Sequence, residues 1–196
     1  MKAKKIVLAI GCLLLCLSAV VAITLRSRLR EAPPTAFAHT RVTDAELIAG
    51  YRKWTRVNPE PVTMAPQSAQ ACAILTPADP NNPHTNKFIT VYVNEIGRHA
   101  MMEEEKPHFP QGSIIVKEKL TSPTSTRPEL LTVMIKRASG YNPESGDWEY
   151  LVTDGTGKTI LQRGRLENCQ ACHLRDKSTD YIARSYLPPE VTRQLK

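Results

Sequence analysis

Cysteine is scarce in this chain, with five residues among 196, and its placement excludes several kinds of site. Cys12 and Cys16 lie in an apolar N-terminal run, where free cysteine behaves as a small hydrophobic residue. Lipidation is the alternative, but the run before Cys12 is short for a lipoprotein signal. Cys72 has no obvious partner, so we expect a buried thiol there. A zinc site needs four ligands, and outside the apolar run there is no second cysteine pair to complete one.

Acidic residues are missing from the first 30 positions, which hold six of the 26 lysines and arginines. The rest of the chain has 20 basic and 19 acidic residues, so the net charge of +7 is a property of the N-terminus. Nucleic-acid binding requires a clustered basic face, which this balance does not supply. We therefore expect no nucleic-acid partner. The chain also lacks internal repeats, and its remaining residues, about 165, are enough for one domain with a core.

Residues 6–25 form an uncharged apolar run of twenty residues between basic flanks. That length can span a bilayer, whereas the apolar part of a signal peptide is usually shorter. Val20-Val21-Ala22 is only a passable cleavage site. We therefore predict an uncleaved N-terminal membrane anchor, with a cleaved signal peptide as the alternative.

Either alternative places the rest of the chain on the periplasmic side of a bacterial inner membrane. The sequence then divides into an anchor or signal at 1–30, a linker containing proline and alanine at 31–42, and an exported domain at 43–196.

One motif near the C-terminus, Cys169-Gln170-Ala171-Cys172-His173, carries specific chemistry. Two thiols at this spacing on the first turn of a helix can each add to a vinyl group of haem, and the next residue places an imidazole under the iron. A thioredoxin-type C-x-x-C follows an early strand, whereas this motif comes late in the chain. The motif predicts one covalent haem c, with Cys169 and Cys172 as thioether residues and His173 as the proximal iron ligand.

The hydrophobic pattern predicts an α+β fold, with an antiparallel sheet of about five strands and flanking helices. A capping box at Thr43-Asp44-Ala45-Glu46 begins an amphipathic helix that ends before Asn58. A long loop follows at 57–86, a second helix lies at 95–106, and the haem motif opens a last helix that ends at Pro188-Pro189. Alternating, β-branched segments predict strands at 87–94, 112–120, 130–138, 148–153 and 158–163.

Neither methionine nor histidine occurs after His173, so a second axial ligand would have to come from earlier in the chain. Each candidate also has an ordinary role in the core or on the surface, and we therefore expect an open distal site. Five-coordinate haem binds small molecules, whereas six-coordinate haem mainly transfers electrons. The candidates are Met64, Met101, Met102, Met134, His84, His99 and His108.

Several blocks of sequence, in order, resemble the cytochrome P-460 family, the hydroxylamine-oxidising c-type cytochromes. The resemblance implies a β-rich fold, a helix-borne haem, a redox partner cytochrome and often a homodimer. The blocks are YRKW at 51–54, TVYVN at 90–94, FPQGSIIVKE at 109–118, YNPESGDW at 141–148, and the haem motif followed by Thr179-Asp180-Tyr181.

The resemblance also implies a lysine joined covalently to a meso carbon of the haem, and the matching position is Lys117. Related cytochromes c-prime-beta share the fold, lack this bond and bind nitric oxide. From the residues alone, a strand lysine points to solvent, and Lys119 shares its face. A lysine desolvated against a porphyrin becomes a nucleophile. The family's distal carboxylate has three candidates here: Glu118, Glu144 and Glu149.

Three functional hypotheses remain open at this point. The first is oxidation of hydroxylamine to nitrous oxide or nitric oxide, with electrons passed to another cytochrome. The second is binding of nitric oxide without turnover, and the third is electron transfer through a six-coordinate haem. A high-spin ferric spectrum would exclude the third, and turnover of hydroxylamine separates the first from the second.

The apolar run gives a prediction about the location of the protein. We expect the full chain to fractionate with membranes and to resist salt extraction, because residues 6–25 are long enough to span and the lysines before them stay cytoplasmic. Membrane fractionation and N-terminal sequencing check this. A soluble periplasmic protein that begins near Ile23 would show instead that the segment is a cleaved signal peptide.

Overall fold

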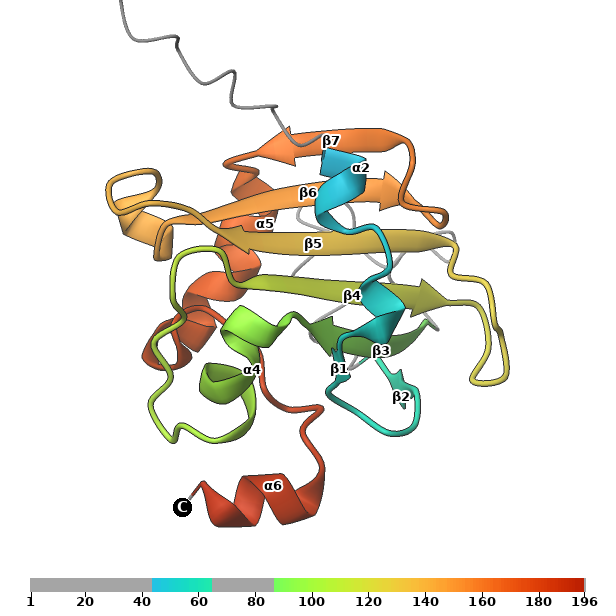
Figure 1. Ribbon diagram of the computed structural model, residues 1–196, viewed down its shortest axis with the longest axis horizontal. Helices are drawn as coiled ribbons and strands as arrows, with labels where there is room; N and C mark the ends of the chain where they lie inside the picture. The colour runs from blue at the N-terminus through green and yellow to red at the C-terminus, as the bar shows by residue number, and fades with distance from the viewer. Residues whose placement is uncertain (1–43, 65–86, 196) are drawn as a thin grey trace, which may run out of the picture. The chain divides into compact units, whose positions relative to one another are not determined.

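The computed structural model of the chain describes residues 44–64 and 87–195 (Figure 1). The predicted anchor, the linker, Cys72, His84 and most of the predicted loop at 57–86 lie outside the described residues. Within the two described ranges, no helix is both long enough and apolar enough to cross a membrane.

The domain is built on an antiparallel sheet of seven strands in the order β1-β3-β4-β5-β6-β7, with β2 also paired to β3. Each strand from β3 to β7 pairs with the next one along the chain, as expected for strands joined by short connections. The five predicted strands are confirmed: β3 (Phe88–Val93), β4 (Ile114–Leu120), β5 (Leu130–Lys136), β6 (Trp148–Asp154) and β7 (Ile160–Gly164).

Two further strands were not predicted, so the expectation of about five strands was too low. β1 (Thr55–Arg56) and β2 (Val62–Thr63) both pair with β3. Each has only two residues, and a segment of that length cannot show the alternation by which a strand is recognised in sequence.

The first predicted helix is interrupted. A short helix, α2 (Asp44–Leu47), is followed by a separate 3₁₀ turn, η1 (Tyr51–Lys53). Between them Gly50 has a φ of 73°, a left-handed conformation that glycine adopts without steric cost and that ends an α-helix. The apolar residues of the pattern, Ile48 and Tyr51, are nevertheless buried against the sheet.

The other helices are shorter than predicted. In α4 (Glu95–Met102) the side chain of Asn94 caps the N-terminus by accepting a hydrogen bond from Gly97 N. The haem motif lies in α5 (Glu167–His173), which continues as the 3₁₀ segment η3 (Leu174–Thr179). The prediction of one helix from the motif to Pro188 was wrong, because the chain turns left-handed at Asp180; a last helix, α6 (Pro189–Gln194), follows.

Alternating side chains give the sheet two faces, which we name after the helices that cover them (Figure 1). The α2 face carries Val116 and Glu118 of β4, and the α5 face carries Ile115, Lys117 and Lys119 of the same strand. On the α2 face an apolar cluster joins Ile48, Tyr51, Tyr92, Ile114, Val116, Leu131, Val133, Ile135 and Leu151. On the α5 face a second cluster joins strand residues to α4 and the C-terminal segments, and includes Val91, Val93, Met101, Phe109, Met134, Trp148, Tyr150, Tyr181 and Ile182.

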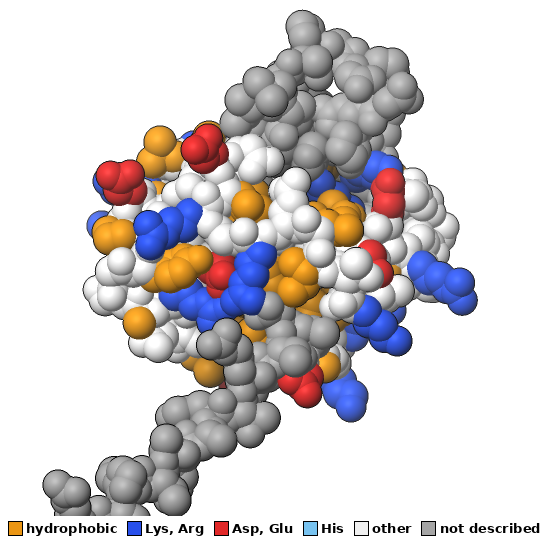
Figure 2. Space-filling model, turned by 90° about the horizontal axis from the view of Figure 1, so that it is seen from above, with side chains coloured by type: hydrophobic (Ala, Val, Ile, Leu, Met, Phe, Trp, Pro, Cys, Tyr) orange, Lys and Arg blue, Asp and Glu red, His pale blue; other side chains and the backbone are white. Residues whose placement is uncertain are grey.

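The surface carries charges of both signs. In the view of Figure 2, lysines and arginines are interspersed with acidic side chains and with small hydrophobic areas. This mixing agrees with the near-balance of 20 basic and 19 acidic residues after position 30 of the sequence.

The cluster on the α2 face gives a stability prediction. We expect Ile135→Ala to lower the free energy of unfolding by about 2–5 kcal/mol, because Ile135 is 2% exposed and its truncation leaves a cavity. The matched control is Ile96→Ala: Ile96 is 52% exposed, and its loss should cost less than about 0.5 kcal/mol. Denaturant unfolding measures both, and equal losses would contradict this assignment of the core.

Candidate haem site

The three chemically active residues of the motif lie on one helix and face one cavity. Cys169, Cys172 and His173 are spaced three and four residues apart on α5, so they share one side of the helix. Cys172 is buried, Cys169 is half-buried, and all three line the cavity.

The sheet supplies the opposite wall of the cavity, in cross-strand rows on the α5 face. One row contains Ile115, Met134 and Tyr150, and the next contains Lys117, Thr132, Val152 and Gln162. A third row pairs Lys119 with Leu130. Ile182, Ala183 and Tyr186 of the C-terminal segment complete a cavity of about 320 Å³.

Lys117 lies in this cavity together with the motif. The interpretation from residues alone, that a strand lysine points to solvent, is wrong here, because the C-terminal segment covers this face of β4. Lys119 shares the face, as predicted, and is only 1% exposed. The sequence pattern could not show this enclosure, since it depends on a helix about fifty residues away.

His173 is prepared to bind a metal through one ring nitrogen. The backbone oxygen of Tyr181 lies 2.7 Å from Nδ1, and because a carbonyl only accepts, Nδ1 carries the proton and Nε2 keeps a lone pair. Burial, with a smaller effect from the positive charge of Lys117, lowers the pKa of His173 to about 4. The imidazole is therefore neutral at pH 7, which is the form that ligates iron.

Tyrosines frame the same cavity. The ring of Tyr150 lies 5.7 Å from that of His173, and burial raises the pKa of Tyr150 to about 12. Burial also raises the pKa of Tyr186. Both phenols are therefore neutral at physiological pH. Neither tyrosine could be predicted as a site residue, because no pattern in the chain distinguishes the two from core tyrosines.

Of the candidates for a second axial ligand, Met134 is the one that the described residues place in the cavity wall. Met64 and Met101 are buried away from the cavity lining, and Met102 is partly buried against the core. His99 and His108 are exposed. Met134 also packs in the core cluster of the α5 face.

The three candidate carboxylates lie elsewhere. Glu118 is buried on the α2 face, where it accepts hydrogen bonds from the Tyr51 hydroxyl (2.6 Å) and from Arg52 Nε (2.7 Å). Glu149 is buried between Arg137 and Arg163, with Nε–O distances of 2.6 and 2.7 Å. Glu144 is exposed. None of the three lines the described cavity.

The residues present fit a c-type haem. Two thiols and a neutral imidazole line one side of a cavity whose walls are mainly apolar, and the imidazole keeps a lone pair on Nε2. Cys169 and Cys172 could form the thioethers, and His173 could supply the axial nitrogen.

The family model of cytochrome P460 matches residues 48–183, most of the chain. The chain belongs to the cytochrome P460 family. Proteins of this family are c-type haem proteins with covalently bound haem, so the chain is a c-type cytochrome. A comparison with curated proteins found no match.

The surroundings of Glu149 give a prediction about pH. Burial acts to raise the pKa of Glu149, but hydrogen bonds and charge from Arg163 and Arg137 outweigh it and hold the pKa below its usual value. The resulting stabilisation is present above the unfolded pKa, about 4.3, and is lost as the pH falls through the folded pKa. We expect Glu149→Gln to lower stability at pH 7 and to flatten its decline in acid, measured by denaturant unfolding at several pH values. A decline as steep as in the unmutated protein would contradict the assignment.

Proposed function

We propose that this cytochrome oxidises hydroxylamine, to nitrous oxide or nitric oxide, on the periplasmic side of a bacterial inner membrane. The observation that carries the proposal is that Lys117 and the motif Cys169–His173 line the same cavity. Family membership makes a hydroxylamine-oxidising cytochrome a natural assignment, and the cavity places this lysine next to the motif that would hold the haem.

The residues have separate roles in the proposal. Cys169 and Cys172 hold the haem through thioethers, and His173 binds the iron through Nε2 while Tyr181 fixes the ring by accepting from Nδ1. The bound haem supplies the iron that binds hydroxylamine and accepts its electrons. Apolar side chains such as Ile115 and Ile182 limit the access of water to the site. A partner cytochrome removes the electrons.

Lys117 is proposed to bond to the haem through its Nζ. The bond would form with loss of one hydrogen from the amine and one from the macrocycle, that is, two protons and two electrons, and a two-electron oxidant such as a peroxide would take up the electrons. Lys117 is half-buried and lines the same cavity as the motif, which is the position that such a bond requires.

A second candidate function is binding of nitric oxide without turnover. It is favoured by one observation: none of the three glutamates considered as proton acceptors lines the described cavity. A site without a carboxylate can bind a small ligand, but it lacks that route for the protons that hydroxylamine must lose.

Haem attachment is the first test. We expect the protein, made with a c-type maturation system, to keep its haem through denaturing electrophoresis, because thioethers survive denaturation. Cys169→Ala together with Cys172→Ala should abolish the haem stain. Loss of haem from the unmutated protein would overturn the proposed function.

The second test concerns Lys117. We expect the denatured holoprotein to weigh less than chain plus haem by the hydrogens lost in the cross-link, and its ferrous Soret band to be strongly red-shifted. Lys117→Ala should restore an ordinary c-type spectrum and lose hydroxylamine oxidation while still binding nitric oxide. Stability should change little, because the core and both thioethers remain.

Lys119→Met is the matched control, since Lys119 faces the same cavity two residues along β4. It should keep the red-shifted band. An ordinary c-type spectrum in the unmutated protein would show that the cross-link is absent, and nitric oxide binding would then be the better assignment.

A further inference from the structure

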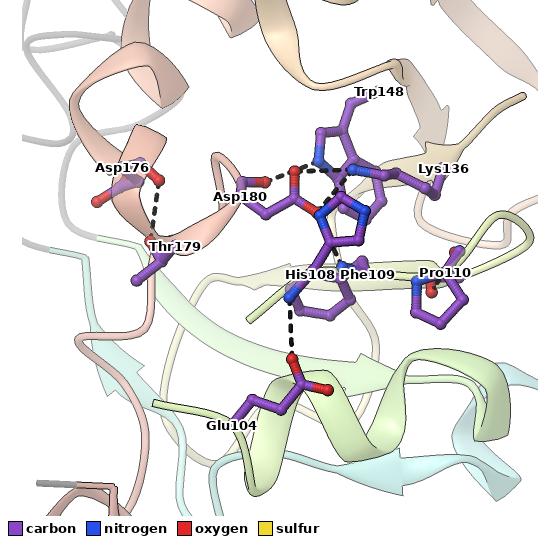
Figure 3. A network of polar contacts seen from close by, with 10 residues as sticks. Glu104, His108, Phe109, Pro110, Lys136, Trp148, Asp176, Thr179 and Asp180 are labelled. Atoms are coloured by element: carbon purple, nitrogen blue, oxygen red, sulfur yellow. Dashed lines mark hydrogen bonds and ion pairs between the residues drawn. The ribbon is translucent and has the colours of Figure 1, made fainter. Parts of the chain in front are cut away.

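Asp180 is the centre of a buried polar network that includes Lys136, Trp148 and Phe109 (Figure 3). Its carboxylate oxygens lie 2.7 and 2.6 Å from Lys136 Nζ, and Oδ2 also accepts a hydrogen bond from Phe109 N at 2.9 Å. Its backbone oxygen accepts from Trp148 Nε1 at 2.8 Å. The side chains of Asp180 and Lys136 are each only 8% exposed, so the two form a buried ion pair.

The network holds a strained piece of backbone. Asp180 has a φ of 54° and Tyr181 a φ of 65°, so two successive residues with side chains are left-handed. Such a conformation costs free energy and persists only where the surroundings impose it. The contacts of Asp180 with β5, β6 and the segment before β4 supply that constraint.

Packing reinforces the same turn. A Cβ on Gly146 would lie 2.6 Å from Tyr181 Cδ2 and 2.9 Å from Asp180 Oδ1, so the loop before β6 rests directly on both residues. Lys136 Nζ lies 4.9 Å from the centre of the Trp148 ring, which limits where the lysine can move. The turn therefore has contacts on several sides.

The carbonyl that follows this turn faces the motif. Tyr181 O accepts the hydrogen bond from His173 Nδ1 at 2.7 Å. Its direction depends on the left-handed conformations of Asp180 and Tyr181, because a peptide carbonyl cannot reorient without a change in the dihedrals beside it.

We propose that the Asp180–Lys136 ion pair is a positioning device for His173, which aims the Tyr181 carbonyl at Nδ1 and so sets the reduction potential of the cytochrome. The inference rests on the proposed role of His173 as iron ligand. Asp180 and Lys136 are positioning residues, since neither belongs to the described lining of the cavity.

The direction of the effect follows from the hydrogen bond. A strong acceptor at Nδ1–H makes the imidazole a better donor at Nε2 and favours the more highly charged ferric iron. When the Tyr181 carbonyl points less directly at Nδ1, His173 donates less electron density to the iron, and the ferrous state becomes more stable relative to the ferric state. Loss of the ion pair should therefore raise the reduction potential.

If the Asp180–Lys136 pair served only to stabilise the fold, two apolar residues in the same positions would serve as well. Buried ion pairs are often no more stabilising than well-packed hydrophobic residues of similar volume. The ion pair does, however, fix the orientation of Asp180, because both carboxylate oxygens and the backbone oxygen of this residue accept hydrogen bonds from donors at defined positions.

The test uses holoprotein with Asp180→Asn, with Lys136→Met, and with both. Asparagine has the same shape as aspartate and tolerates left-handed backbone, so the first variant preserves the turn best. The double variant removes one charge of each sign, which cancels the simple electrostatic effect on the iron. Spectroelectrochemistry gives the reduction potential. NMR of the ferrous protein with bound carbon monoxide and ¹⁵N-labelled histidine gives the exchange rate of the His173 Nδ1 proton.

We expect each variant, including the double one, to shift the ratio of ferrous to ferric protein about tenfold at fixed ambient potential, which is about 59 mV upward for one electron. The Nδ1 proton should exchange with solvent at least about tenfold faster, because its hydrogen bond opens more often. The control Glu149→Gln removes an equally buried, ion-paired carboxylate from the α2 face, and it should lower stability without moving either quantity.

Two failures are distinguishable. If the ¹⁵N resonance of Nε2 in the unmutated protein shows no iron ligation, His173 is not the ligand, and both the proposed function and this inference are wrong. If ligation is present and the double variant keeps the potential and exchange rate of the unmutated protein, the inference is wrong and the proposed function stands. If either single variant yields no holoprotein, the double variant, with no unpaired buried charge, decides.

Discussion

The register of β4 against β5 and β6 is the constraint on which the site depends. Because side chains alternate, a slip of one residue in β4 would move Lys117 to the α2 face and bring Glu118 into the cavity. The register is specified by apolar residues on both faces, Ile115 on one and Val116 on the other. A buried glutamate on the α2 face adds to this, since Glu118 is held there by Tyr51 and Arg52.

The C-terminal part of the chain converts that face of the sheet into a site. Helix α5 brings two thiols and an imidazole over the rows of β4, β5 and β6, and the segment after η3 closes the cavity with Ile182 and Tyr186. The left-handed turn at Asp180 is what directs the chain back over the motif, and the same turn supplies the carbonyl that fixes His173. Closure of the cavity and orientation of the His173 ring thus involve the same turn.

Two of the carboxylates considered as proton acceptors are buried on the face of the sheet away from the cavity. The carboxylates considered as proton acceptors, Glu118 and Glu149, are on the α2 face and are neutralised by arginines, where they tie strands and connections together. On the α5 face, the lysines and acidic residues among the described lining of the cavity are two lysines, Lys117 and Lys119.

Local pattern was sufficient for much of the fold. Alternation over six or seven residues identified the long strands, and the spacing Cys169–His173 identified the chemistry and, through family membership, the haem. Both signals are contained in a few adjacent residues. The pattern failed where a feature was too short, as in β1 and β2, or where a single glycine outweighed a helical period, as at Gly50.

Only the tertiary structure decided which face of β4 meets the haem motif, that Lys117 lines the cavity, and that Met134 reaches its wall. It also decided that the carbonyl bonded to His173 follows directly on Asp180, which is paired with Lys136. Each of these joins residues that are far apart in the chain. A sequence specifies which side chains share a strand face or a helix side, because those follow from local geometry. It does not specify which of two faces a distant helix will cover, because that depends on the packing of all the segments together.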